Sequence, residues 1–396
     1  MKKMEVKPKI ETFARIKVLG IGGSGTNAVN RMTQLGIRGV EFISINTDAQ
    51  ALHNNQADRK VHIGKGATKG LGSGMNPDLG RQAAEESVEE LEEVIDNADM
   101  VFITCGLGGG TGSGAAPIVA ELAKNKGVLT VGVVTKPFTF EGSKRKEVAE
   151  TAYDNLKDKV DAIISIHNDR ILQIIDKKTS LIDAFKTVDE VLRQGIAGIS
   201  DLITTHGIVN ADFADVKSIM QDAGTALMGI GRASGENRAQ DAAKAAINSP
   251  LLEMTIDGAK GVLFNITGGA SLGMFEIDEA AKVITRSIDS DAKVKFGAVI
   301  DDSMGDEIRI TVIATGFDES SKRPTPAALM LNDDLVKKPK IQEQKFTTAP
   351  APMENRKPMF NPKPAPTIEM AGDFPSDDVV GEDELDIPAF IRKKMK

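Results

Sequence analysis

Cysteine and large aromatic residues are scarce in this sequence. Cys105 is the only cysteine among 396 residues, tryptophan is absent, and Tyr153 is the only tyrosine. A single cysteine excludes a disulfide framework and a four-cysteine zinc site, and it is typical of a protein in a reducing compartment. With so few aromatic rings, the chain also lacks the stacking platforms on which single-stranded nucleic acids bind.

The charge balance and the lack of long apolar runs exclude further classes of protein. The chain has 49 Lys and Arg against 57 Asp and Glu, a net charge of −8 at pH 7, which argues against a nucleic-acid partner. We expect no membrane-spanning helix, because the sequence contains no apolar run of the required length. Residues 1–15 lack the apolar core of a signal peptide. The composition therefore predicts an acidic protein of the cytoplasm.

Glycine and proline are distributed unevenly along the chain. Of the 38 glycines, only Gly372 and Gly381 follow residue 316, whereas eleven of the 16 prolines do. Residues 318–380 are poor in apolar residues and show no periodicity, which predicts a disordered linker. Residues 381–396 run from acidic through apolar to basic side chains, an order typical of a peptide that folds onto a partner's groove. A frayed tail that only keeps the chain soluble is the alternative.

Before residue 316, apolar strands alternate with amphipathic helices. The expected strands are 15–22, 40–48, 99–106, 128–138 and 161–169, and the expected helices are 26–36, 81–98, 116–127 and 144–160. This alternation predicts an α/β fold with a doubly wound, Rossmann-like parallel sheet. A long helix is expected over 179–204, followed by helical segments at 218–235 and 237–248 and strands at 261–269, 293–301 and 307–317. These last elements predict a second, smaller α+β domain.

The first glycine loop, GIGGSGTN at 20–27, lies between an expected strand and an expected helix. Gly20, Gly22 and Gly25 satisfy the GxGxxG pattern, in which glycines let backbone N–H groups approach a phosphate at a helix N-terminus. Glu41 follows about 20 residues later, where a dinucleotide fold holds the ribose. This loop alone favours a dinucleotide, and a tight strand-to-helix turn is the alternative.

A second glycine loop, GLGGGTGSG at 106–114, also lies between a strand and a helix. Two such cradles favour a nucleoside triphosphate over a dinucleotide, with Thr111 donating a hydroxyl to the phosphates. The Walker pattern GxxxxGK[ST] is absent, so this is not a P-loop protein. The glycine-rich stretch 64–80 is interpreted as a flap near the phosphates or, alternatively, as a surface hairpin.

Three polar residues stand close together after the long expected helix, in GIVNADFADV at 207–216. Asp212 has the properties of a helix N-cap. Asn210, Asp212 and Asp215 at this spacing are also able to orient a water molecule or to hold Mg²⁺. The residues themselves do not decide between these functions.

Several segments together resemble the tubulin/FtsZ family of GTPases, and within it the FtsZ proteins of bacterial cell division. GGGTGSG at 108–114 resembles the family signature, and 207–216 resembles its synergy loop. NTDAQAL, TKGLGSGMNPDLG, KPFTFEGSKR and DIPAFIRKKMK also match the family's pattern, at 46–52, 68–80, 136–145 and 386–396. The resemblance covers the whole chain except the linker.

The resemblance implies GTP contacts from both glycine loops and from three later segments. The implied loop contacts are Gly23, Ser24, Gly25, Thr26 and Asn27, and then Gly108, Gly109, Gly110, Thr111 and Gly112. Glu141 and Arg145 match positions near the ribose and phosphates, Asn168 matches a ribose or base contact, and Phe185 matches a residue against the guanine ring. Asp189 matches the position that pairs with guanine, where a carboxylate accepts from N1–H and the N2 amino group.

The resemblance also implies how the protein works. FtsZ-like subunits stack head to tail into filaments that form the cytokinetic ring, so that Asp212 and Asp215 of one subunit polarise the water that attacks the GTP of the next, and Asn210 helps to place it. The backbone cradle and Mg²⁺ meet the charge on the γ-phosphate. The implied organisation is a flexible N-terminus (1–12), a GTP-binding domain (13–178), a central helix (179–204), a C-terminal domain (205–317), the linker and a tail peptide (381–396).

The tail peptide implies partners that tether the filament indirectly to the membrane, of the FtsA, ZipA or SepF type. The implied location is the cytoplasm at midcell.

Two other functions remain alternatives at this point. A dinucleotide-dependent oxidoreductase accounts for GxGxxG and Glu41 but leaves the second glycine loop without a role. A non-catalytic nucleotide-binding scaffold of the tubulin type accounts for both loops but not for the pair of Asp212 and Asp215.

Overall fold

A computed structural model describes residues 14–37, 39–176, 178–204, 209, 211–252 and 254–317. The predictions made for the N-terminal segment 1–12, for Asn210, for the linker 318–380 and for the tail peptide 381–396 lie outside these residues.

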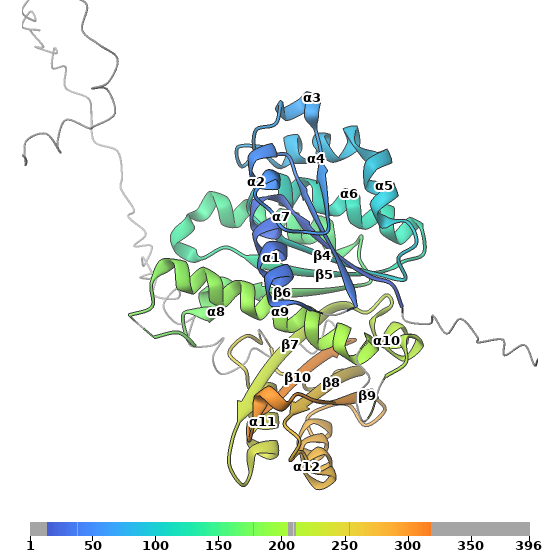
Figure 1. Cartoon of the computed structure of the whole chain (residues 1–396), viewed down its shortest axis with the longest axis vertical. Coiled ribbons are helices and arrows are strands. Elements are labelled where there is room, and N and C mark those ends of the chain that lie inside the picture. The colour runs from blue at the N-terminus through green and yellow to red at the C-terminus, as the bar shows by residue number, and fades with distance from the viewer. Residues whose placement is uncertain are drawn as a thin grey trace, which may run out of the picture. The chain divides into compact units, whose positions relative to one another are not determined.

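Seven parallel strands form the first sheet (Figure 1). Their order is β3-β2-β1-β4-β5-β6-β7. The strands are β1 (Ile16–Ile21), β2 (Val40–Asn46), β3 (Arg59–His62), β4 (Met100–Gly106), β5 (Leu129–Lys136), β6 (Ala162–His167) and β7 (Gly224–Ala233). The predicted doubly wound sheet is confirmed, and its order reverses between β1 and β4, where such sheets bind ligands.

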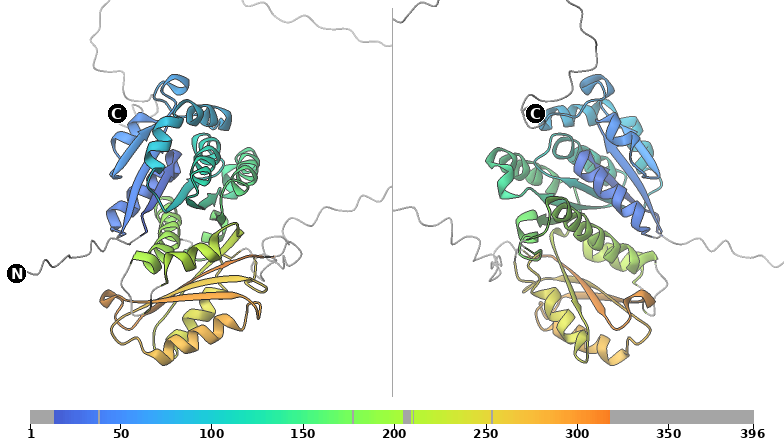
Figure 2. Two further views of the ribbon diagram at one scale, coloured as in Figure 1. Left: turned by 90° about the vertical axis from the view of Figure 1, so that its right-hand side faces the viewer. Right: turned by 60° about the vertical axis from the view of Figure 1, so that its left-hand side comes forward.

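Helices cover both faces of this sheet (Figure 2). They are α1 (Gly22–Leu35), α2 (Ala49–His53), α3 (Lys65–Thr68), α4 (Pro77–Glu86), α5 (Val88–Ile95), α6 (Thr111–Asn125), η1 (Thr139–Glu141), α7 (Ser143–Lys157) and α8 (Asn168–Ile171). Alternate residues of β1 point to opposite faces: Ile16 and Val18 pack with α1, and Leu19 and Ile21 pack with α4 to α7. The sheet is therefore buried on both sides, as parallel sheets are.

The helix α9 (Leu181–Thr204) runs along the first sheet and also contacts the second. Its apolar face shares one core with β1, β4 and β5, and it touches β8 (Gly261–Gly268), β9 (Lys293–Ile300) and β10 (Ile308–Thr315). The short helix α10 (Phe213–Met220) follows it and packs on the same core.

The second sheet has the order β7-β10-β8-β9 and shares β7 with the first. Strand β10 pairs antiparallel with both β7 and β8, and β9 pairs parallel with β8. The helices α11 (Arg238–Ile247) and α12 (Met274–Thr285) cover one face and form a separate core with it, and η2 (Asp302–Met304) connects β9 to β10. The predicted smaller α+β unit is confirmed.

The prediction of helical structure over 218–235 is wrong, because residues 224–233 form β7. Ala, Leu and Met in this segment are good helix formers, but packing overrides that preference. A Cβ atom on Gly229 would meet the carbonyl oxygen of Ala246, and one on Gly231 would meet that of Ala242. The close approach of α11 to β7 therefore requires glycine at both positions.

Smaller differences concern the ends of elements. The helix expected over 81–98 is interrupted at Ser87, and the four-residue strand β3 was not predicted. Helices α1 and α6 begin at Gly22 and Thr111, four and five residues before the predicted starts. Glycines assigned to loops from the sequence therefore belong to the first turns of two helices.

We predict that Gly231→Ala lowers the free energy of unfolding by about 1–3 kcal/mol, because the new methyl group overpacks the contact with α11. Urea denaturation measures this loss. Gly72→Ala is the matched control, since no atom lies within 4 Å of a Cβ built there. Equal denaturation midpoints for the two variants would show that the contact is not tight.

Candidate functional site

The N-termini of α1 and α6 meet at the carboxyl ends of β1 and β4. A Cβ on Gly22, where φ is +73°, would lie 2.7 Å from the backbone nitrogen of Gly112. Neither helix carries an acidic residue in its first turn. The first N–H groups of a helix have no partner within it, and the helix dipole adds partial positive charge there. Two such ends side by side form an anion site, suited to neighbouring phosphate groups.

A cavity of about 250 Å³ opens between these helix ends. Its lining includes seven residues of the predicted site and eight others: Gly23, Ser24, Gly109, Gly110, Thr111, Gly112 and Arg145, with Ile21, Gly22, Asn46, Asp48, Ala51, Gly72, Ser73 and Gly106. The structure thus brings both glycine loops to one cavity.

The other predicted loop residues lie beside this cavity but do not line it. Gly25 is packed so closely that a Cβ would meet the carbonyl oxygen of Thr104, and the Thr26 hydroxyl donates to the carbonyl oxygen of Gly23 at 3.1 Å. Asn27 is exposed on α1. Gly108, where φ is +91°, donates its N–H to the Ser113 hydroxyl at 2.9 Å.

Thr111 connects three segments at the start of α6. Its hydroxyl oxygen is 2.8 Å from that of Thr47, which follows β2, and 2.9 Å from that of Ser73, in the glycine-rich stretch 64–80. That stretch therefore lies at the cavity, and Gly72 and Ser73 line it. The hydroxyl contacts hold all three segments around the anion site.

Sequence reasoning missed two cavity residues at the carboxyl end of β2: Asn46, its last residue, and Asp48, two residues beyond it. The Asn46 Oδ1 accepts the N–H of Thr47 at 2.9 Å, whereas its Nδ2 is buried without a partner. Asp48 caps α2 by accepting the N–H groups of Gln50 and Ala51 at 2.9 and 3.1 Å. The order of the sheet could have identified these two residues, because β2 is the parallel neighbour of β1 and the carboxyl ends of both strands lie at the same edge.

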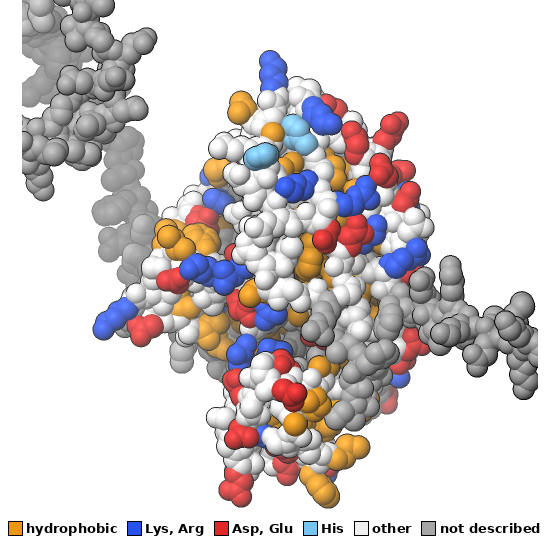
Figure 3. Space-filling view, in the orientation of Figure 1, with side chains coloured by type: hydrophobic (Ala, Val, Ile, Leu, Met, Phe, Trp, Pro, Cys, Tyr) orange, Lys and Arg blue, Asp and Glu red, His pale blue; other side chains and the backbone are white. Residues whose placement is uncertain are grey.

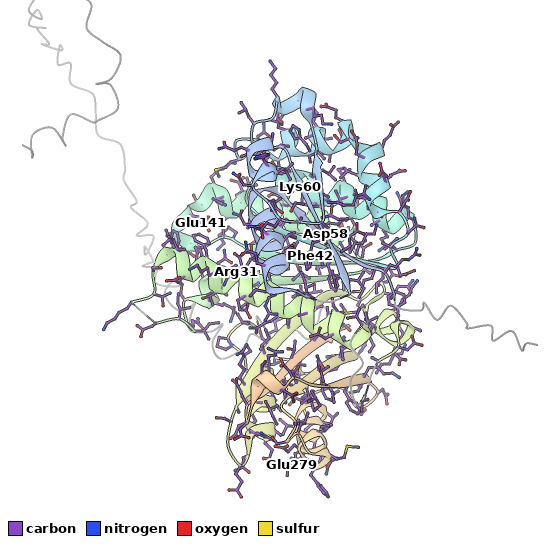
Figure 4. The ribbon with its side chains drawn as sticks, in the orientation of Figure 1. Arg31, Phe42, Asp58, Lys60, Glu141 and Glu279 are labelled. Carbon is purple, nitrogen blue, oxygen red and sulfur yellow. The ribbon has the colours of Figure 1, made fainter. Side chains whose placement is uncertain are left out.

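Glu141 and Arg145 form an ion pair at the side of the cavity. Arg145 Nη1 lies 3.0 Å from Glu141 Oε2, and the second carboxylate oxygen accepts the N–H of Phe138 at 2.8 Å. Figure 4 shows Glu141 next to α7, the helix that carries Arg145. Glu141 thereby holds the guanidinium of Arg145 at the cavity, where its Nε has no protein partner.

Asn168, Phe185 and Asp189 do not line this cavity, and they lie on α8 and α9. Asn168 is buried, with an unpartnered Oδ1. The half-exposed ring of Phe185 packs edge to face on Phe138, with 5.6 Å between centroids. Burial raises the pKa of Asp189 to about 6, partly opposed by the guanidinium of Arg31, which extends from α1 near α9 (Figure 4).

Asp212 and Asp215 lie away from the cavity of their own chain. Asp212 caps α10: its Oδ1 accepts the N–H of Ala214, with 3.4 Å between the oxygen and the nitrogen. Asp215 forms an ion pair with Lys295 at 2.9 Å. The N-cap interpretation of Asp212 is therefore correct for its local contacts.

The position of Glu41 contradicts the interpretation of the first glycine loop as part of a dinucleotide site. It lies near the amino end of β2, where it pairs with Lys17 at 3.3 Å, and the glycine loops lie at the opposite edge of the sheet. Lys17 also donates to the carbonyl oxygens of Val94 and Asp96. Glu41 is therefore a structural ion-pair partner and cannot reach a ribose at the cavity.

None of the helices that the structure describes combines the length and hydrophobicity needed to span a bilayer.

Comparisons with known proteins agree with the geometry. The GTPase-domain model of the Tubulin/FtsZ family matches residues 15–176, and the C-terminal-domain model of the FtsZ family matches residues 224–318. A solved FtsZ dimer from M. jannaschii, described as empty, is 44% identical, with a TM-score of 0.75. That match covers 77% of this chain and 89% of that one.

Two further structures extend this likeness. A variant of FtsZ from the same organism is 43% identical, with a TM-score of 0.76, and the match covers 80% of this chain and 95% of that one. CetZ1 from Haloferax volcanii, solved as a GDP-bound monomer, shares the fold at 20% identity and a TM-score of 0.67, covering 81% of this chain and 98% of that one. The chain belongs to the FtsZ family, the filament-forming cell-division GTPases of the tubulin/FtsZ group.

Proposed function

We propose that the paired N-termini of α1 and α6 hold the phosphates of GTP and that hydrolysis is completed by the next subunit of a filament. The observation that carries the first part is the approach of Gly22 to Gly112, which aims two sets of free N–H groups into one cavity. Arg145, held by Glu141, adds a cation. Preorganised donors of this kind stabilise charge that develops on a transferred phosphoryl group.

The guanosine end is proposed to lie between α1 and α9. Phe185 offers an aromatic face, and the unpartnered Oδ1 of Asn168 offers an acceptor for a ribose hydroxyl. The carboxylate of Asp189 accepts from the N1–H and N2 amino groups of guanine and rejects adenine, which presents a different pattern of donors. Burial makes this pairing selective, because an unmatched base would leave the carboxylate without donors.

Hydrolysis is proposed to require two copies of the chain. Asp212 and Asp215 belong to the unit that we place at 205–317, and they do not line the cavity of the unit that we place at 13–178. Head-to-tail stacking through a heterologous contact generates open filaments and brings this acidic segment to the neighbour's γ-phosphate. There, Asp212 and Asp215 polarise the attacking water, and Asn210 positions it.

Mg²⁺ is proposed to act together with the nucleotide. Within the described ranges, no three His, Cys, Asp or Glu side chains come together as a metal site, and Asp48 is the only carboxylate among the described cavity residues. Mg²⁺ at nucleotide sites keeps several waters and uses phosphate oxygens with one or two protein groups. This donor set fits an ion near Asp48 and Thr111, where it neutralises phosphate charge.

The location and partners are proposed from the sequence and the family. Residues 381–396 bind division proteins of the FtsA, ZipA or SepF type, which tether the filament indirectly to the membrane at midcell. The acidic, apolar and basic order of this peptide supports the proposal.

We predict that Asp212→Ala and Asp215→Ala each lower GTP turnover by at least about 100-fold, the size of effect seen when one group that acts on the transition state is removed. GTP affinity stays within about twofold, because neither residue lines its own cavity. Phosphate release and equilibrium nucleotide binding measure the two quantities. Asp241→Ala, an exposed acid on α11, is the control. A parallel loss of binding and turnover would refute action on a neighbouring subunit.

We predict that Asp189→Asn weakens GDP binding about 10- to 100-fold, because a hydrogen bond to a charged group contributes roughly 1.5–3 kcal/mol. The amide instead donates to the C2 carbonyl of xanthine, so binding of xanthosine diphosphate improves. Competition titrations compare the two nucleotides. Asp183→Asn, on the exposed first turn of α9, leaves both affinities unchanged. Unaltered base preference in the Asp189 variant would disprove the assignment.

We predict that the affinity for GDP falls as Asp189 becomes protonated. With a pKa of about 6, the carboxylate is ionised at pH 7.5 and about three-quarters protonated at pH 5.5, which lowers affinity about fourfold. The phosphates of GDP also titrate with pH, so the affinity of the unaltered protein is divided by that of the Asp189→Asn variant at each pH. A ratio that stays constant from pH 7.5 to 5.5 would contradict the prediction.

A further inference from the structure

Strand β9 holds the segment that carries Asp212 and Asp215 at two points. The N–H of Ala298 donates to the carbonyl oxygen of Val209 at 3.0 Å, and the ammonium of Lys295 lies 2.9 Å from Oδ1 of Asp215. β9 is the last strand of the second sheet, and α10 contacts it. Asp212 stands between the two attached residues in the sequence, so β9 anchors the acidic segment on both sides of it.

The pleat of β9 directs Lys295 toward the acidic segment. Three of its neighbours on the strand pack in the core that is formed with α11 and α12: Val294, Phe296 and Ala298. Side chains alternate along a strand, so Lys295 and Gly297 face the other way, toward α9 and α10. A Cβ on Gly297 would clash with Leu202 of α9, which confirms the direction of this face. The position of Lys295 beside Asp215 therefore follows from the register of the second sheet.

Asp215 has a local alternative to Lys295 that it does not use. It stands three residues after Asp212, the N-cap of α10, and an acid at this position can accept the N–H of the N-cap residue. Within the described part of the chain, the Asp215 carboxylate accepts no backbone N–H, and Lys295 is its only ion-pair partner. The pair uses Oδ1 and leaves Oδ2 for a water molecule. Lys295 thus holds this carboxylate away from the end of its own helix.

Stability alone does not account for this ion pair. Figure 3 shows Lys and Arg side chains beside Asp and Glu side chains over much of the face that it draws. The side chains of Lys295 and Asp215 are 44% and 36% exposed, and exposed ion pairs contribute little to the free energy of unfolding. What distinguishes this pair is its location, since it joins a cation to one of the two acids that we propose to act on the neighbour's GTP.

A cation beside Asp215 also favours the approach of two subunits. Carboxylates that meet the phosphates of a neighbour's GTP are repelled, because like charges oppose each other across an interface. Lys295 offsets part of this repulsion for Asp215. Asp212 forms no ion pair with the described residues and caps α10 instead. The two acids are therefore held in different ways, and Asp215 depends on a partner from β9.

We propose that Lys295 is a positioning residue, which holds the Asp215 carboxylate in the orientation from which it polarises the attacking water at the neighbouring subunit. This inference rests on the function proposed above, in which Asp212 and Asp215 act on the GTP of the next subunit. Without the ammonium, the carboxylate turns toward the N–H of Asp212, and its charge meets the phosphates without compensation. A displaced group of this kind lowers turnover and leaves the nucleotide cavity of its own subunit unchanged.

The test measures GTP turnover per assembled subunit, at protein concentrations chosen so that each variant sediments to the same extent. Lys295→Gln is expected to lower turnover at least about 10-fold while GTP affinity stays within about twofold, because Lys295 does not line the cavity. Lys295→Arg keeps a cation that pairs with carboxylates and is expected to restore most of the turnover. Turnover of Lys295→Gln equal to that of the unaltered protein would overturn the proposal.

The matched control is Lys293→Gln. Lys293 is exposed two residues earlier on the same face of β9, and it forms no ion pair within the residues that the structure describes. This variant removes the same charge from the same strand and is expected to leave turnover unchanged. An equal loss in both variants would show that the charge of the strand matters rather than the ion pair, and would also overturn the proposal.

A double-mutant cycle separates positioning from direct contact with the phosphates. If Lys295 acts through Asp215, the variant Asp215→Ala/Lys295→Gln turns over as slowly as Asp215→Ala alone. A further loss of about 10-fold in the double variant would overturn positioning in favour of direct contact.

The same cycle tells the failure of this inference from the failure of the proposed function. Normal turnover in Asp215→Ala would refute the action of this acid on a neighbour's GTP. Slow turnover in Asp215→Ala together with normal turnover in Lys295→Gln would refute only the role of Lys295.

Discussion

The approach of two helix N-termini at the β1/β4 reversal is the constraint on which the rest of the site depends. Gly22 has to be glycine, because its φ is +73° and a Cβ there would lie 2.7 Å from the backbone nitrogen of Gly112. A Cβ on Gly112 would make tight contacts of 3.2 Å with the carbonyl oxygens of Gly106 and Ile21. The hydroxyl of Thr111, in the first turn of α6, lies within hydrogen-bond distance of both Thr47 and Ser73. This arrangement lowers the stability of the fold, because glycine loses more conformational entropy on folding than other residues. The first N–H groups of both helices also lack hydrogen-bond partners unless an anion binds.

The sequence predicted much of this arrangement because local rules govern it. Strand and helix periodicity gave the doubly wound sheet, and the glycine spacing led to the cavity. It did not predict β7, because the need for Gly229 and Gly231 arises only when α11 packs on that strand. Asn46 was missed for a similar reason, since its place at the cavity follows from the pairing of β2 with β1. Glu41 was misread because sequence distance alone cannot tell the two ends of a strand apart.

Among the described residues, neither of the two acids proposed for hydrolysis lies at the proposed nucleotide cradle. The only carboxylate lining the cavity, among the residues described, is Asp48, and it caps α2. Asp212 and Asp215 instead follow α9, the helix that touches both sheets. On the proposed mechanism, the cradle of one subunit and the acidic segment of the next confine hydrolysis to places where two subunits are joined.

The most direct test mixes two variants that are each inactive. Asp212→Ala keeps the cradle and loses the acid. Gly109→Asp keeps the acid but places a negative charge in the cavity, and its Cβ fits because the nearest neighbouring atom would be the carbonyl oxygen of Gly106 at 3.8 Å. If the site is shared between subunits, mixing restores GTP turnover, because the second variant's acid acts on the first variant's GTP. If mixing restores nothing while the two variants still assemble together, the site lies within one chain and the account is wrong.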